Sequence, residues 1–112
     1  MSKKPLMLTG KQARLLRSLG HHLSPTAMIG REGITDNVVK SAEAVLTARE
    51  LIKVKIQENC PLDKKEAATT LAKKTRSGIA QIIGKTFLLY RENKDLPEDK
   101  KIKLPVKEPT ES

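Results

Sequence analysis

Apolar residues recur with two different periods along the chain, and the changes of period mark the boundaries of the predicted elements. Near the start, leucines fall on one face of a helix, at Leu15, Leu16, Leu19 and Leu23. Thr9 and Gln12 have the spacing of a capping box, which predicts that this helix begins at Thr9. Pro25 prevents the helix from continuing.

The next stretch alternates between strand and helix patterns. Residues 26–29 form a short apolar run that fits a strand, and Thr35 can serve as the N-cap of a second helix. The apolar face of that helix is predicted at Val38, Val39, Ala42, Val45 and Leu46. Residues 51–57 alternate between apolar and polar from Ile52 onward, which is typical of a half-buried strand.

A third helix and a hairpin complete the pattern. Asp63 can cap the helix, Gly78 is placed to end it, and its predicted buried side holds Ala67, Ala68, Leu71 and Ala72. The β-rich runs 79–83 and 86–90 are separated only by Gly84-Lys85, which indicates a type II′ hairpin. The resulting order α-β-α-β-α-β-β predicts an α/β fold, with a four-stranded mixed sheet and three helices.

Three regions are expected from this pattern. Residues 8–91 form the predicted domain, residues 1–7 precede it as an N-terminal arm, and residues 92–112 form a mostly flexible charged tail. The tail contains three prolines, although the segment 102–105 within it could dock locally.

Composition adds a strong charge asymmetry to this picture. The net charge of the chain is +9, and because residues 92–112 contain five lysines against six acidic residues, the excess lies wholly in residues 1–91. Such a surface suits the binding of anionic polymers, although the simpler explanation is that the positive charge only keeps the protein soluble. With one cysteine, no signal-peptide pattern and no apolar run long enough for a membrane span, we expect a cytoplasmic protein.

The first predicted helix carries the clearest candidate contacts. Its basic residues follow one another at spacings of three on the side opposite the leucines, at Lys11, Arg14 and Arg17, and His21 lies one turn further along the same polar face. This helix contains no acidic residue, which favours a phosphate-contacting surface over an ordinary solvated face.

The loop Gly30-Arg31-Glu32-Gly33 is a second candidate. It connects a predicted strand to a helix N-terminus, where free amides and the helix dipole favour a phosphate. The two glycines allow a nucleic-acid backbone to approach, as in the clamp loop of KH domains, and Arg31 can add a contact. Glu32 weakens a purely electrostatic role, and Lys85 in the hairpin could place another cation at the surface.

No constellation for catalysis or metal binding is visible. His21 and His22 are adjacent and cannot both bind one metal from a helix, and Cys60 has no second thiol or histidine nearby in sequence. We therefore expect that the protein is not an enzyme and that it uses neither a cofactor nor a small-molecule substrate. Aromatic residues make up only 2% of the chain, so recognition is expected to use backbone and shape rather than base stacking.

Several short segments, in this order, resemble the CRM domain, named for chloroplast RNA splicing and ribosome maturation, in its bacterial YhbY-like stand-alone form. The segments are Leu8-Thr-Gly-Lys-Gln12, Leu19-Gly-His-His-Leu23, Met28-Ile-Gly-Arg-Glu-Gly-Ile-Thr35, Glu50-Leu-Ile-Lys-Val-Lys55, Gln81-Ile-Ile-Gly-Lys-Thr86 and Leu89-Tyr-Arg91. The similarity extends from about Leu8 to Arg91, and 101–105 resembles that group's usual ending.

This resemblance implies a fold related to the C-terminal domain of translation initiation factor 3. It also implies RNA binding through the first helix and the Gly30–Gly33 loop, by a monomer acting on precursors of the large ribosomal subunit. Two alternatives remain open: a general nucleic-acid-binding protein, and a protein-interaction module that uses a sheet edge or the tail.

Overall fold

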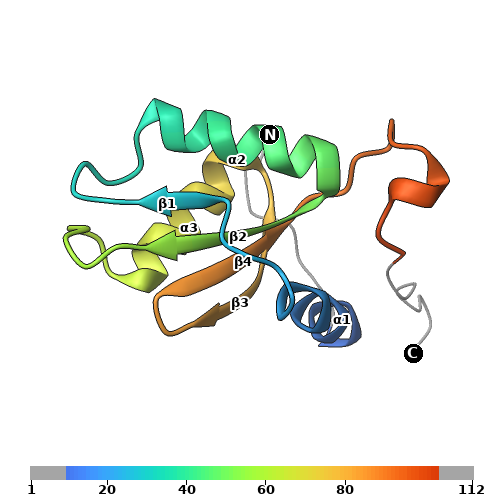
Figure 1. Ribbon diagram of the computed structural model, residues 1–112, viewed down its shortest axis with the longest axis horizontal. Coiled ribbons are helices and arrows are strands. Elements are labelled where there is room, and N and C mark those ends of the chain that lie inside the picture. Colours follow the sequence, from blue (N-terminus) through green and yellow to red (C-terminus); the bar gives the residue numbers. More distant parts are fainter. Residues whose placement is uncertain (1–9, 104–112) are drawn as a thin grey trace.

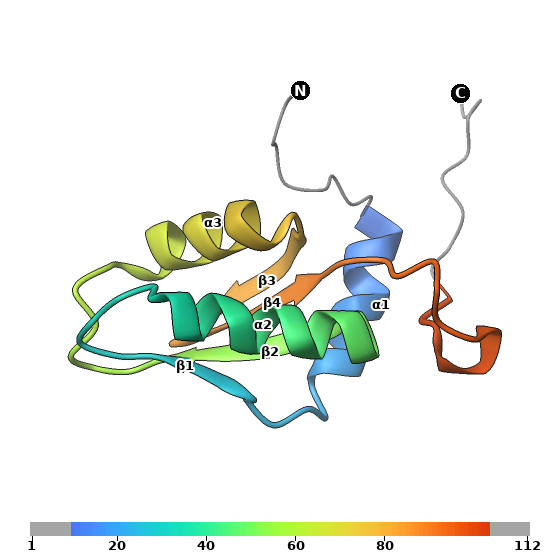
Figure 2. The same ribbon diagram turned by 90° about the horizontal axis from the view of Figure 1, so that it is seen from above.

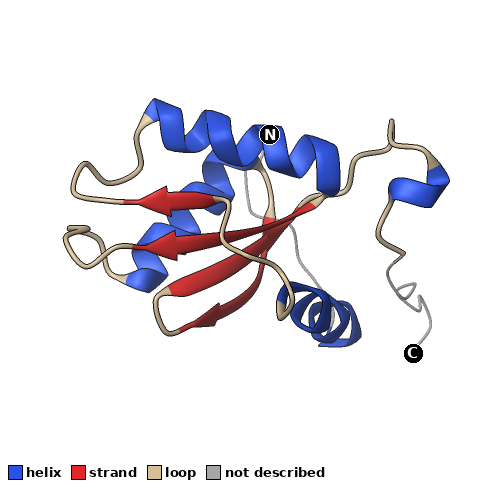
Figure 3. Ribbon diagram, viewed as in Figure 1, coloured by secondary structure: helices blue, strands red, loops and turns tan. Residues whose placement is uncertain are grey.

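The computed structural model describes residues 10–103, so the predicted arm 1–7 and the N-cap Thr9 lie outside the described residues. Three helices and four strands alternate in the predicted order (Figures 1 and 3). The helices are α1 (Gly10–Gly20), α2 (Asp36–Arg49) and α3 (Lys64–Thr75), followed by a short 3-10 helix η1 (Glu98–Lys100). The strands are β1 (Ala27–Ile29), β2 (Leu51–Ile56), β3 (Gly78–Ile83) and β4 (Thr86–Tyr90).

The four strands form one mixed sheet in the order β1-β2-β4-β3. β1 pairs parallel to β2, while β4 pairs antiparallel to both β2 and β3. The predicted four-stranded mixed sheet is therefore confirmed.

Helices α2 and α3 lie side by side on one face of the sheet (Figure 2). The alternation in β2 turns Ile52, Val54 and Ile56 toward them, as the sequence predicted. Phe87 and Leu89 of β4 join the same core, and both are fully buried. The core is thus almost entirely aliphatic, and the single phenylalanine of the chain lies inside it.

Helix α1 covers only part of the opposite face. Leu16 is fully buried there against Leu51, Leu88 and Tyr90. A Cβ on Gly20 would lie 2.4 Å from Leu88 Cδ1, so the absent side chain allows the helix to approach the sheet closely. The predicted leucine face is only partly correct, because Leu19 is 40% exposed at its flank.

The predicted caps of the later helices are correct, with one exception. Thr35 Oγ1 accepts from the Val38 amide, and Asp63 accepts from the Glu66 amide in a full capping box. Gly78 does not end α3 as predicted. The helix ends at Arg76, whose left-handed φ of 57° forms the C-cap, and Gly78 begins β3. In the hairpin only Gly84 has positive φ, as a type II′ turn requires.

The described part of the predicted tail, residues 92–103, follows a defined path held by one buried carboxylate. Glu50 is fully buried. Its Oε2 accepts from the Asn93 amide and its Oε1 from the Ile102 amide, both at 2.7 Å, while Lys101 Nζ lies 3.5 Å from Oε2. These contacts set Ile102 against the cluster of Leu16 and Tyr90.

Tyr90, in the cluster with Leu16, makes the free energy of unfolding dependent on pH. Burial, with a smaller contribution from Glu50 and Glu92, raises the pKa of Tyr90 from 10.0 to about 12. The unfolded chain therefore loses this proton at lower pH than the folded protein, and the resulting loss of stability begins as pH rises through 10. The free energy of unfolding should fall relative to that of Tyr90→Phe by up to about 1.4 kcal/mol per pH unit between pH 10 and 12. Urea denaturation of both proteins across this range measures the difference; parallel curves would contradict it.

Candidate nucleic-acid interface

The predicted cationic face of α1 is exposed in the fold. Lys11, Arg14 and His21 are exposed and Arg17 is half-buried, on the side of the helix opposite Leu16. The His21 amide donates to the Arg17 carbonyl at 3.0 Å, so the helical path continues to this residue. None of these four side chains takes part in a salt bridge within residues 10–103. The charges of the lysine and the two arginines are therefore available to an external anion.

The loop Gly30–Gly33 closes as a tight turn after β1. The Gly33 amide donates to the Gly30 carbonyl at 3.0 Å, and Gly33 has φ of +74°, where other residues are strained. Gly30 has a different reason to lack a side chain, because a Cβ there would lie 2.7 Å from Gln57 Oε1. Arg31 and Glu32 form the exposed tip.

The N-terminus of α2 is less open to an anion than the sequence suggested. Thr35 already caps the Val38 amide, and Asp36 places a carboxylate in the first turn. Glu32 adds a second exposed carboxylate in the preceding loop. Negative charge at this position opposes the attraction of the helix dipole for a phosphate. Arg31 is thus the main cation that this loop offers.

Lys85 lies at the same end of the sheet as the Gly30–Gly33 loop. Its carbonyl accepts from the Ile56 amide at 2.7 Å, while the next amide, that of Gln57, donates to the Ile29 carbonyl at 2.9 Å. The end of β2 is therefore bonded on one side to the hairpin and on the other side to the strand that precedes the loop. The exposed Lys85 side chain projects from this hairpin.

The structure does not bring α1 and the Gly30–Gly33 loop together. Helix α1 packs where β2 begins, at Leu51, whereas the loop adjoins the end of β2 at Ile56. These positions are separated by about 17 Å, from about 3.3 Å per strand residue. Figure 1 shows the same separation, with α1 at the lower right and the β1–α2 connection at the left.

The sheet surface between these two ends is a candidate that the sequence analysis missed. One row across the four strands is formed by Met28, Lys55, Thr86 and Ile83, which are paired in register. Met28 is 52% and Ile83 58% exposed, and Lys55 is also exposed. No helix covers this part of the sheet face within residues 10–103 (Figure 1). The alternation of residues 51–57 predicted the polar side of β2, but not which neighbours would complete the row.

Within 10–103, histidine, cysteine and acidic side chains form no group of three that could hold a metal ion. In the same range no helix has both the length and the apolar character needed to cross a membrane.

The fold and these surfaces define a small α/β domain with a basic helix on one end of its sheet and a glycine loop at the other. The chain belongs to the CRS1 / YhbY (CRM) domain family, whose sequence pattern matches residues 8–91. The resemblance found in the sequence is thereby confirmed. The further likeness to the C-terminal domain of translation initiation factor 3 stays a prediction.

Relatives from several bacteria match most of the chain. "Probable RNA-binding protein YqeI" of Bacillus subtilis is 50% identical over 99 residues, which cover 88% of this chain and all of the relative. "RNA-binding protein" of Haemophilus influenzae is 36% identical over 100 residues, covering 89% and 97%. The solution structure of SAV1595 from Staphylococcus aureus superposes with a TM-score of 0.73 at 48% identity, covering 88% of this chain and all of that one.

Proposed function

We propose that this protein is a non-enzymatic RNA-binding protein of the cytoplasm that binds ribosomal RNA in precursors of the large subunit. The observation that carries the proposal is the α1 face of Lys11, Arg14, Arg17 and His21, which has no carboxylate partner in residues 10–103. Two relatives that this chain matches over nearly their full length are named as RNA-binding proteins, which supports RNA as the partner of this chain.

Helix α1 and the Gly30–Gly33 loop lie at opposite ends of β2, which limits how one RNA can contact both. An RNA that touches both α1 and the Gly30–Gly33 loop has to cross the uncovered part of the sheet, where Lys55 is exposed between Met28 and Thr86. Phosphates would lie on the α1 cations, Lys55, Arg31 and Lys85. The wide spacing suits a folded RNA surface, in which phosphates at several positions are fixed relative to one another.

Salt dependence tests the RNA-binding part of the proposal. With one phosphate contact on each of these six lysine and arginine cations, log affinity should fall against log salt with a slope near −4, from roughly 0.7 per contact for single strands. Fluorescence anisotropy with labelled ribosomal RNA fragments measures this slope. Competition with duplex DNA of equal length is the control: equal affinity would favour a general nucleic-acid-binding protein, and no RNA binding at low salt would refute the proposal.

Sedimentation of a cell lysate tests the ribosomal part. The protein is expected to travel with precursors of the large subunit on a sucrose gradient at low salt. If it remains only in the soluble fractions, the RNA partner is not a ribosomal precursor.

The two glycines of the loop should respond differently to alanine. At Gly33, φ of +74° makes Gly33→Ala cost about 1–2 kcal/mol of folding free energy. At Gly30 the one close contact of the new methyl is the end of the flexible Gln57 side chain, and Asn59 Oδ1 lies at an ordinary 3.9 Å, so Gly30→Ala should change stability by less than about 0.5 kcal/mol. If the RNA backbone approaches this loop, Gly30→Ala should still lower RNA affinity about fivefold, the effect of one lost contact.

Combining Gly30→Ala with Gln57→Ala, with Gln57→Ala alone as the reference, provides the control, because it removes the close protein contact of the new methyl group. If the loss of RNA affinity persists in the double variant, it is caused by contact between the new methyl group and the RNA. Unchanged affinity in both variants would remove Gly30 from the interface. Anisotropy and urea denaturation of the same preparations supply both measurements.

A further inference from the structure

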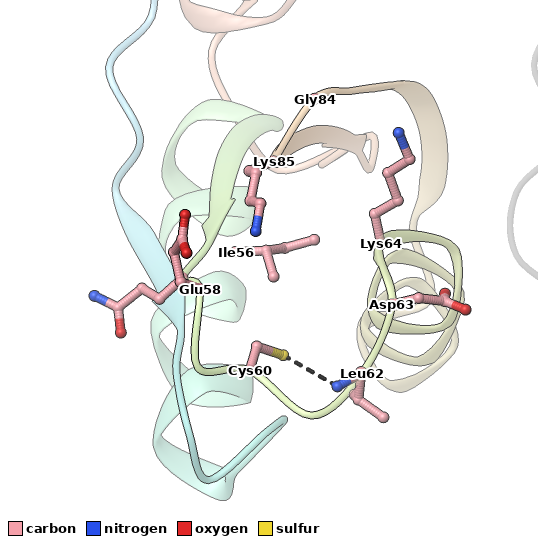
Figure 4. A pocket seen from close by; sticks show the side chains of 9 residues that line it. Ile56, Glu58, Cys60, Leu62, Asp63, Lys64, Gly84 and Lys85 are labelled. Atoms are coloured by element: carbon pink, nitrogen blue, oxygen red, sulfur yellow. Dashed lines mark hydrogen bonds between the residues drawn. The ribbon is translucent and has the colours of Figure 1, made fainter.

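Three segments that are distant in sequence enclose a cavity of about 380 Å³ beside the end of β2. Its walls come from the end of β2, the β2–α3 connection and the β3–β4 hairpin, and include Ile56, Glu58, Cys60, Leu62, Lys64 and Lys85 (Figure 4). This volume lies at the small end of the roughly 300–1,000 Å³ typical of small-molecule sites.

The floor of the cavity is apolar. Ile56 is 5% exposed and belongs to the main core, against which Cys60 and Leu62 also pack as partly buried neighbours. Figure 4 shows the side chains of Ile56 and Cys60 directed into the cavity. The Leu62 amide donates to Cys60 Sγ at 3.4 Å, which holds the thiol in this position.

The rim is polar and carries both signs of charge. Lys64 and Lys85 are exposed on it, and the Lys85 side chain extends toward the cavity (Figure 4). Glu58 is exposed on the opposite wall. Asp63 points away in Figure 4, and it accepts from the Glu66 amide at 2.8 Å as the cap of α3. The rim thus offers two ammonium donors and one carboxylate acceptor.

We propose that this cavity takes one unstacked nucleobase of the bound RNA, an inference that rests on the proposed RNA-binding function. A flat, largely apolar base fits the floor of Ile56 and Cys60 (Figure 4), as bases removed from their stack enter apolar pockets elsewhere. The rim matches the edge of a base, which presents donors and acceptors together. A bare phosphate fits it less well, because Glu58 would repel the anion.

The position of the cavity agrees with this assignment. The segment 57–60 forms its wall and also contacts the glycine loop, since a Cβ on Gly30 would lie within 4 Å of both Gln57 and Asn59. A nucleotide whose backbone lies on the Gly30–Gly33 loop therefore has the cavity as its neighbour, across one short segment. Lys85 is then close to both the phosphate and the base of that nucleotide.

The single cysteine of the chain reports directly on this site. N-ethylmaleimide alkylates an accessible thiol, so its reaction rate with Cys60 of the unaltered protein measures whether the cavity is filled. We expect ribosomal RNA fragments at saturating concentration to slow the reaction about tenfold, which corresponds to a base held by about 1.4 kcal/mol. Heparin, a polyanion without bases, should occupy the cationic surface and leave the rate within about twofold.

Anisotropy measured in the same samples separates the two proposals. If RNA binds but the alkylation rate is unchanged, the RNA-binding function stands and the cavity is not a base site; a pocket for a protein partner would behave this way. If heparin protects Cys60 as well as RNA does, the protection comes from the backbone, and the proposal is overturned. If RNA does not bind at all, the proposed function itself fails.

Two substitutions give an independent measurement. Cys60→Leu fills the cavity and should lower RNA affinity about tenfold, because it displaces the base. Val39→Leu adds bulk at a partly buried residue of α2 that does not line the cavity, and should stay within about twofold of the unaltered protein. Equal affinity of the two leucine variants would contradict the proposal. Should Cys60→Leu fail to fold, the alkylation rates of the unaltered protein decide the question.

Discussion

Replacement of Lys11, Arg14 and Arg17 together by glutamate is expected to reduce affinity for ribosomal RNA by at least about 100-fold. Each charge-assisted contact contributes about 1.5–3 kcal/mol when it is not screened, and the new carboxylates repel the phosphates in addition. The slope of log affinity against log salt should also become shallower by about 0.7 for each lost contact. Anisotropy over a range of salt concentrations measures both effects.

A matched variant distinguishes this effect from a general change of net charge. Lys40, Lys73 and Lys74 are exposed on α2 and α3, which cover the other face of the sheet. Their replacement by glutamate changes the net charge by the same amount and should lower RNA affinity by less than about fivefold, through long-range attraction alone. Equal losses in the two triple variants would mean that RNA binding follows net charge and has no preferred face.

The largest effect on stability is expected at Glu50. The two carboxylate oxygens of Glu50 accept from the Asn93 and Ile102 amides. In Glu50→Gln one of these oxygens is replaced by the NH2 of the side-chain amide, so that this NH2 and a backbone N–H, both donors, face each other. The charge opposite Lys101 is lost as well. Breaking such a buried arrangement should cost about 3 kcal/mol. For a domain of this size we expect Tm to fall by more than about 10 °C.

Glu43→Gln is the appropriate comparison, because it removes a carboxylate of α2, the helix that Glu50 caps, from an ion pair that is only partly buried. Glu43 is 41% exposed and lies 2.7 Å from Arg91 Nη1. Its replacement should cost less than about 1 kcal/mol. Calorimetry of both variants checks the contrast, and similar Tm values for the two would show that burial of Glu50 contributes little.

Most of the fold could be predicted from the sequence because its signals are local. The alternation in 51–57, the caps at Thr35 and Asp63, and the Gly84-Lys85 turn each depend on neighbours within a few residues. The end of α3 was predicted wrongly because its local signal is misleading. A glycine is the usual residue at a left-handed C-cap, and here Arg76 adopts that conformation instead.

The candidate site was predictable in its parts but not in its arrangement. The cationic spacing of α1 and the glycine pair are visible in the sequence, whereas their separation by the length of β2 follows from which end of the sheet each element meets. Glu50 was missed because a single glutamate after a helix gives no sign that it will be buried. The cavity beside Cys60 was missed for a related reason, since three distant segments form it.

The way in which α1 is seated has a consequence for the order in which the protein matures on the ribosome that makes it. The helix is synthesised early, yet the residues that receive Leu16 belong to β2, β3, β4 and the segment that ends at Ile102. Until those have emerged, the apolar side of α1 has nothing to pack against. The helix that carries the proposed α1 contacts is therefore translated before the residues that support it, so a nascent chain truncated before Ile102 should present this helix without its full support.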